Sequence, residues 1–225
     1  MQKIFTMNSF TKENYLKAIF TLLEKEQVEV STNAIAEQMN TKPASVTDML
    51  KKLAEKKLIN YQKYQGVTLT ALGTEKALAI IRKHRLWEVF LVEKLNFKWD
   101  EVHDIAEELE HINSKELVER LDKFLNCPKY DPHGDPIPDS NGKLQHQDCK
   151  TLAQMATNTN CIMTGIIDHS SVFLKHLNNL EIALGIEIKI KEIVAYDKAL
   201  YIKINNGKEL YISNLIAQNI LVIEK

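Results

Sequence analysis

Hydrophobic residues recur at intervals of three and four along the first half of the chain, a pattern typical of amphipathic helices. Polar residues with capping side chains separate these segments, and two short β-type runs surround a glycine. In chain order, the pattern predicts helices over residues 8–26, 31–39 and 44–53, followed by a hairpin of strands over residues 58–61 and 67–70. Long helices are then expected over residues 71–126.

The period changes in the second half. Four prolines within twelve residues exclude a helix after residue 126, so residues 127–150 are predicted to form a loop. A helix is expected over residues 170–178, and the strand-like runs are 186–193, 200–204, 209–212 and 220–223. We therefore expect a mainly α fold with α+β parts, ending in a small SH3-like β-barrel preceded by a helix. The predicted domains are residues 1–73, 74–140 and 141–225.

Composition narrows the class of protein. The 225 residues carry a formal net charge of -1, so any binding of nucleic acid has to come from a local basic patch. There is no run of 18 apolar residues, which argues against a membrane span. The three cysteines have no metal-binding spacing and no signal peptide is recognised, so we expect a cytoplasmic protein. They are Cys127, Cys149 and Cys161.

Residues 31–70 have the order helix, turn, helix, hairpin, which is typical of a winged helix-turn-helix domain. Between Thr41 and Gln65 there are six lysines and two acids, an excess that suits contacts with DNA phosphates. The second helix begins with small polar residues that permit close approach to base edges. The alternative is a three-helix module that binds protein or acts as a linker. The candidate DNA-binding residues are Lys42, Pro43, Ala44, Ser45, Thr47, Asp48, Lys51, Lys52 and Lys63.

An acidic stretch from Asp100 to His111 holds six acids, two histidines and no basic residue. Its apolar positions have helical spacing, which would place four metal-ligating side chains on one face. Like charges on one helical face repel each other, and a divalent cation would relieve that repulsion. The alternative is a solvated acidic helix. The four side chains are those of His103, Glu107, Glu110 and His111.

A second pair of candidate ligands, His84 and Glu88, lies four residues apart in another predicted helix. Two helices that each offer His and Glu could pack together and complete a metal site. The same helix carries more apolar residues than its own packing needs, among them Trp87, Phe90 and Leu95. We expect this surplus to form a homodimer interface.

Taken together, these motifs make the chain resemble the diphtheria-toxin-repressor family of metal-dependent transcriptional repressors. The resemblance covers nearly the whole chain. Its motifs are Asn14-Tyr15-Leu16, the winged helix-turn-helix, Arg82-Lys83-His84-Arg85-Leu86, the stretch His103–His111, and the loop containing Cys127-Pro128 and His133-Gly134-Asp135-Pro136-Ile137-Pro138.

The resemblance implies two neighbouring metal sites. The primary site would use Asn14, Glu107, Glu110 and His111. The ancillary site would use His84, Glu88 and His103 with one ligand from the carboxy-terminal domain, either Asp168 or His169. Iron-responsive members carry Cys at the position of Glu107, so a carboxylate there resembles the manganese-responsive branch. Some manganese regulators have a second acid at the position of Lys17, so a binuclear primary site is not expected.

The implied function is a repressor of metal-uptake genes, and therefore of metal homeostasis, that binds double-stranded operator DNA as a homodimer. Mn²⁺ would be the co-repressor, with Fe²⁺ as the alternative, and no enzymatic activity is expected. A rival from another class is a metallohydrolase that uses the His and Glu cluster around a water. A third interpretation is a metal-independent winged-helix regulator whose acidic helix only dimerises.

Overall fold

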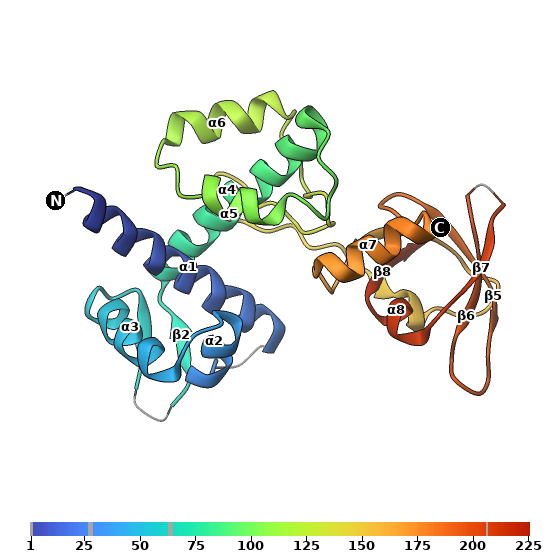
Figure 1. Cartoon of the computed structure of the whole chain (residues 1–225), viewed down its shortest axis with the longest axis horizontal. Coiled ribbons are helices and arrows are strands. Elements are labelled where there is room, and N and C mark those ends of the chain that lie inside the picture. The colour runs from blue at the N-terminus through green and yellow to red at the C-terminus, as the bar shows by residue number, and fades with distance from the viewer. Residues whose placement is uncertain (1, 27–28, 63–64, 206) are drawn as a thin grey trace. The chain divides into compact units, whose positions relative to one another are not determined.

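The computed structural model describes residues 2–26, 29–62, 65–205 and 207–225, and Lys63, a predicted DNA contact, lies outside them. The chain forms two compact units, which are described separately below (Figure 1). Unit 1 comprises Met1–His84, Leu109–Asn113 and Pro138–Lys143, and unit 2 comprises Arg85–Glu108, Ser114–Ile137 and Leu144–Lys225. No helix among the described residues is long and apolar enough to cross a membrane.

Unit 1 contains the predicted winged helix-turn-helix. Its elements are α1 (Gln2–Glu26), α2 (Thr32–Gln38), α3 (Pro43–Glu55), β1 (Ile59–Tyr61), β2 (Val67–Leu69) and the first part of α4 (Ala71–Leu95). Strands β1 and β2 pair antiparallel, with Ile59 opposite Leu69. The helices and the hairpin close around one apolar core that includes Leu16, Ile35 and Leu50. The predicted order of helices and strands is therefore confirmed.

Local sequence explains where these elements begin. The side chain of Ser31 caps α2 by accepting a hydrogen bond from the backbone N–H of Ala34, as expected for a helix N-cap. Pro43 opens α3, where its missing N–H costs nothing. Gly73 lies so close to β1 that a Cβ there would meet the carbonyl oxygen of Leu58 at 1.9 Å. A glycine is therefore required where α4 passes the hairpin.

Two predicted helix boundaries were wrong. The first helix begins at Gln2 instead of residue 8, because no glycine or proline occurs in residues 2–7 to prevent a helix there. The acidic stretch forms only the short helix α5 (His103–Leu109), and Glu110 and His111 lie in the turn that follows it. The next helix, α6 (Lys115–Phe124), has its own cap at Ser114, so the chain has to leave the helical path before that residue.

Unit 2 holds two apolar cores. The smaller core joins the second part of α4 to α6 and to the loop through Leu86, Val89, Leu121, Leu125 and Ile137. The larger core belongs to the carboxy-terminal sheet. Among the residues described between 127 and 149 there is no helix or named strand, which confirms the predicted loop. Gly134 has a φ of 91° and lies against β4 (Asn160–Ile166), where a Cβ would meet the carbonyl oxygen of Thr164 at 2.1 Å.

The carboxy-terminal part is a small SH3-like sheet with the strand order β3-β8-β4-β5-β6-β7, and Figure 1 shows α7 and α8 beside it. Three of the predicted strands correspond to β5, β6 and β7, and the fourth to β8. The prediction that the helix precedes every strand was wrong, because β3 and β4 come before α7. The remaining elements are β3 (Lys150–Thr151), η1 (Leu152–Gln154), α7 (Ser171–Leu180), β5 (Glu187–Ile193), β6 (Leu200–Ile204), β7 (Glu209–Ile212), α8 (Asn214–Gln218) and β8 (Ile220–Glu224).

Candidate metal sites

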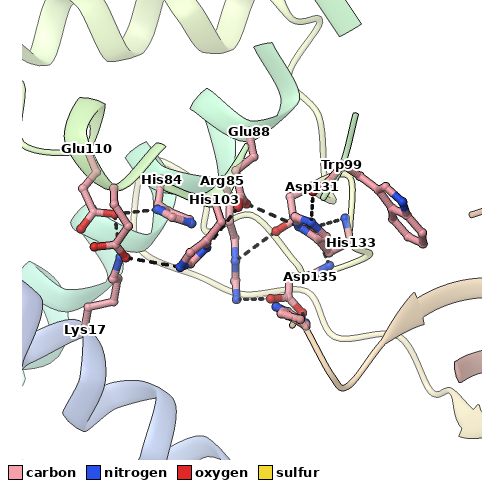
Figure 2. Close-up of polar contacts among 12 residues, drawn as sticks. Lys17, His84, Arg85, Glu88, Trp99, His103, Glu110, Asp131, His133 and Asp135 are labelled. Atoms are coloured by element: carbon pink, nitrogen blue, oxygen red, sulfur yellow. Dashed lines mark hydrogen bonds and ion pairs between the residues drawn. The ribbon is translucent and has the colours of Figure 1, made fainter. Parts of the chain in front are cut away.

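A fully buried carboxylate, Glu110, is the centre of the first group, which lies in unit 1. Its Oε2 accepts a hydrogen bond from Lys17 Nζ at 2.7 Å and lies 2.7 Å from His84 Nδ1 (Figure 2). Burial alone would raise the pKa of Glu110, but the hydrogen bonds and positive charges of His84 and Lys17 outweigh burial and hold the pKa below its usual value. Glu110 is therefore ionised in the folded chain.

Two buried oxygens of unit 1 have no hydrogen-bond partner within the described part of the chain. They are Oδ1 of Asn14 and Oε1 of Glu110. A buried oxygen without a partner costs free energy, and a bound ion is one of the established explanations for such an atom. Amide and carboxylate oxygens are hard donors that suit cations such as Mn²⁺. The donor set in unit 1 therefore fits a divalent metal.

His111 supplies a nitrogen to the same group. Its Nδ1 lies 2.8 Å from Oε2 of Glu13, and its ring stacks on Phe10 with the centroids 4.4 Å apart. Its other nitrogen, Nε2, lies 4.0 Å from Oε1 of Glu110. A carboxylate that accepts from one ring nitrogen fixes the tautomer and leaves the other nitrogen available as a ligand. Glu13 therefore orients His111 in a way that sequence reasoning did not anticipate.

The second group, Glu88, Asp131 and His133, lies in unit 2, and all three residues are buried. One ligand atom from each lies within 4.8 Å of the others, which is close enough to hold one metal ion. His133 Nδ1 is 3.7 Å from Oε2 of Glu88 and 4.0 Å from Oδ1 of Asp131, and Figure 2 shows the three side chains converging. Asp131 and His133 come from the proline-rich loop, and Glu88 comes from α4.

The electrostatics of this second group show how strongly its members interact. Burial raises the pKa of Asp131 to about 7, and the negative charges of Glu88 and Asp135 act in the same direction. Burial would lower the pKa of His133, but the hydrogen bond and charge of Glu88 raise it. Arg85 lies 3.7 Å from Asp131 and 3.0 Å from Asp135 and compensates part of the acidic charge. A bound metal cation would relieve the repulsion among these carboxylates.

Of the predicted ligands on α5, His103 lies beside Glu88 of the second group, and Glu107 lies beside His103. His103 Nδ1 is 3.6 Å from Oε1 of Glu88, and its Nε2 is 3.8 Å from Oε1 of Glu107. The side chain of His103 is 59% exposed. The interpretation of one helical face with four ligands was wrong, because α5 ends at Leu109, before Glu110 and His111.

Of the two predicted ligands from the carboxy-terminal domain, His169 lies nearer the second group. Its ring stacks on His133 with the centroids 5.4 Å apart, and its Nε2 is 4.0 Å from Oδ1 of Asp135. Asp168 instead accepts a hydrogen bond from the backbone N–H of Ser170, at the start of α7.

Four residues of these groups were missed as site residues, namely Glu13, Lys17, Asp131 and His133. Asp131 and His133 could have been found, because both carry metal-ligating side chains and lie in the loop that belongs to the family motif. No sequence signal indicated how Glu13 and Lys17 pair, since their partners lie 98 and 93 residues away along the chain.

The candidate DNA-binding residues lie at the start of α3 and along its exposed side. Thr47 Oγ1 donates to the carbonyl oxygen of Pro43 at 3.1 Å, which leaves its methyl group and the lone pairs of its hydroxyl for other contacts. Lys51 lies 3.6 Å from Asp48 in an exposed ion pair. The exposed members are Lys42, Pro43, Ala44, Ser45, Asp48, Lys51 and Lys52.

Comparison with protein families accounts for nearly all of the chain. Residues 7–67 match the model described as iron dependent repressor, N-terminal DNA binding domain. Residues 70–139 match iron dependent repressor, metal binding and dimerisation domain, and residues 150–224 match the FeoA domain.

Individual relatives agree with these matches. The chain is 38% identical over 113 residues to an uncharacterized HTH-type transcriptional regulator of Methanocaldococcus jannaschii, covering 50% of this chain and 90% of that protein. It is 36% identical over 128 residues to the iron-dependent repressor IdeR of Mycobacterium leprae, covering 57% of this chain and 55% of that one. A solved manganese-dependent transcriptional repressor in complex with manganese is 33% identical, with a TM-score of 0.85 and coverage of 95% of this chain and 100% of that chain.

Proposed function

Because the chain belongs to the diphtheria-toxin-repressor family of metal-dependent transcriptional repressors, we propose that manganese is its co-repressor and that it controls metal-uptake genes. One observation carries the proposal: two buried oxygens, on Asn14 and Glu110, have no hydrogen-bond partner among the described residues and lie in the unit that also contains α3. Metal binding and DNA binding would thereby be linked within one compact unit.

The proposed primary ligands are Asn14, Glu110 and His111, with Glu107 kept from the family pattern. The proposed ancillary ligands are Glu88, Asp131 and His133, with His84, His103 and either Asp168 or His169 kept as candidates from that pattern. A bound divalent cation would supply the positive charge that these buried oxygens lack. Glu13 would hold the His111 ring in place, and His84 would keep Glu110 oriented.

Manganese is favoured over softer metals because oxygen donors dominate the proposed primary set. The solved relative described as a manganese-dependent repressor supports this choice. Fe²⁺ remains the alternative, since IdeR is described as iron-dependent. Zinc prefers four ligands and binds tightly, so we expect it to bind without producing the full response.

The proposed partner is double-stranded operator DNA, bound by a homodimer. The lysines of α3 would contact phosphates, and Ser45 and Thr47 would approach base edges. Dimeric helix-turn-helix proteins place their two recognition helices about one DNA turn apart, so a metal that favours that pose acts as a co-repressor. We propose residues 1–73 for DNA binding, 74–140 for metal binding and dimerisation, and 141–225 for the linker and SH3-like domain.

A regulatory role in the cytoplasm, without enzymatic activity, agrees best with these features. A DNA partner accounts for the winged helix-turn-helix and its exposed lysines, which a metallohydrolase would leave unexplained. The relatives reported above are described as transcriptional regulators or repressors.

The test is DNA binding of the full chain as a function of metal. A duplex selected from a random pool in the presence of Mn²⁺ would be titrated with protein under anaerobic conditions, with Mn²⁺, Fe²⁺, Zn²⁺ or chelator. We expect Mn²⁺ to raise affinity at least about tenfold over chelator, within the range typical of allosteric coupling. Equal affinity in all four conditions would overturn the proposal.

The same assay with Glu107→Cys tests the choice of metal. A thiolate at this position should move the response toward iron or softer ions. If the ranking of metals is unchanged in the variant, Glu107 does not select the metal.

A further inference from the structure

We infer that the ammonium group of Lys17 pairs with the Glu110 carboxylate in the metal-free chain. By competing for that carboxylate, Lys17 lowers the affinity of the chain for metal. This inference rests on the proposed function, because it concerns the metal group of unit 1. It adds a residue that sets the metal concentration at which the chain responds.

The contact itself is close and well buried. Lys17 Nζ lies 2.7 Å from Oε2 of Glu110, and the two side chains are 16% and 0% exposed. Lys17 follows Asn14 by three residues on α1, so both side chains lie on one face of the helix. The ammonium group therefore reaches the metal group from the same helix as a proposed ligand, as Figure 2 shows for its approach to Glu110.

Positive charge already lies beside Glu110 without a metal. Lys17 contacts Glu110, and the charges of Glu13 and Glu110 also act on Lys83. Burial lowers the pKa of Lys83, while the charges of Glu13 and Glu110 oppose that shift. A divalent cation bound at Glu110 would meet the positive charge of Lys17 in a poorly solvated environment, where repulsion is strong.

Lys17 donates its hydrogen bond to the same oxygen of Glu110 that His84 contacts. Both bonds go to Oε2, whereas Oε1 remains without a hydrogen-bond partner among the described residues. A metal that took Oε1 alone would lie next to the ammonium, and a metal that took both oxygens would have to displace it. In either case Lys17 weakens metal binding, and in the metal-free chain it ties α1 to the segment 109–113.

The experiment compares Lys17→Met, which removes the charge and keeps the chain length, with Lys17→Arg, which keeps the charge. Lys17→Gln is a second neutral variant in case Lys17→Met folds poorly. The matched control is Lys25→Met, an exposed lysine near the end of the same helix. Mn²⁺ affinity is measured by calorimetry, and thermal stability is measured with chelator and with Mn²⁺.

We expect both neutral variants to bind Mn²⁺ at least about tenfold more tightly than wild type and to melt at a lower temperature in chelator. Lys17→Arg and Lys25→Met should match wild type in affinity. A neutral variant that loses stability but binds Mn²⁺ no more tightly would overturn the inference, because Lys17 would then be only structural. If the neutral variants bind Mn²⁺ and wild type does not, the inference stands and the proposed function of the natural chain fails. If no variant binds Mn²⁺, both fail.

Discussion

His133 donates a hydrogen bond from Nε2 to the carbonyl oxygen of Trp99 across 2.9 Å. A carbonyl can only accept, so this bond places the proton on Nε2. When His133 is neutral, its Nδ1 is therefore an acceptor, and it faces Glu88 and Asp131. The ring also stacks between Trp99 and His169, with centroid distances of 6.1 and 5.4 Å. A histidine that binds metal typically donates one ring N–H to a carbonyl or carboxylate and offers the other ring nitrogen to the metal.

Replacing His133 by Phe should remove one metal equivalent per chain, because the ring remains but the ligand nitrogen is lost. Stability without metal should fall by about 1–3 kcal/mol, since the buried carboxylates of Glu88 and Asp131 lose a partner. Equilibrium dialysis with Mn²⁺ and urea unfolding check the two effects. The exposed His176 on α7 provides the control His176→Phe. An unchanged metal stoichiometry in the His133 variant would refute the second group as a metal site.

Two substitutions of Asn14 should change the Mn²⁺ affinity in opposite directions. Asn14→Asp adds a charged ligand and should raise Mn²⁺ affinity about tenfold, since ligand charge tunes cation affinity. Asn14→Ala should lower the affinity by a similar factor, yet change metal-free stability by less than about 1 kcal/mol, because it removes a buried oxygen that has no hydrogen-bond partner in the described part of the chain. Calorimetry and thermal unfolding in chelator measure both. Equal affinities in the three proteins would show that Asn14 is no ligand.

Two kinds of substitution on α3 should separate phosphate contacts from base contacts. Lys52→Ala should weaken binding to all duplexes and reduce the salt slope by about one, because one phosphate contact is lost. Ser45→Ala should instead change the preference between bases at one position by about 1–3 kcal/mol. Anisotropy titrations on two duplexes at several salt concentrations distinguish them, with Lys175→Ala in unit 2 as the control. A lysine variant that changed only base preference would contradict this orientation of α3.

Phe124 is a candidate dimer contact, because the residue is 61% exposed and its ring centroid lies 6.3 Å from that of Phe90. An exposed cluster of large apolar residues is typical of an interface. Phe124→Asp should convert a dimer to a monomer at micromolar concentration, as measured by sedimentation velocity. Val172→Asp, which changes another exposed apolar residue, should leave the oligomeric state as it is. A dimeric Phe124 variant would place the interface elsewhere.

Cys161 lies in the core of the carboxy-terminal sheet, where burial raises the pKa of its thiol to about 11. The thiol therefore keeps its proton in the folded chain between pH 9 and 11, whereas the unfolded chain loses it. Its contribution to stability should accordingly be complete below pH 9 and fall as the pH rises toward 11. At pH 8 we expect Cys161 to be alkylated at least about a hundredfold more slowly than the exposed Cys127, as followed by mass spectrometry. Similar rates for the two cysteines would contradict burial of this thiol.

The sequence by itself determined the local elements. Spacing of apolar residues predicted α2, α3 and the β1–β2 hairpin, because helix and strand periods depend only on neighbouring residues. The cap at Ser31 and the proline-rich loop were predicted for the same reason. Local patterns also predicted the candidate metal ligands His84, Glu88, His103, Glu107, Glu110 and His111.

Only the tertiary structure decided which charges meet. Lys17 and Glu110 are 93 residues apart, and neither residue's neighbours indicate that an ammonium group pairs with the buried carboxylate. The acidic stretch was expected to repel itself until a metal bound, whereas Lys17 and His84 already compensate Glu110. His133 likewise reaches Glu88 only because Gly134 lets the loop lie against β4. Long-range pairing of charges depends on how the elements pack, and apolar spacing along the chain does not encode it.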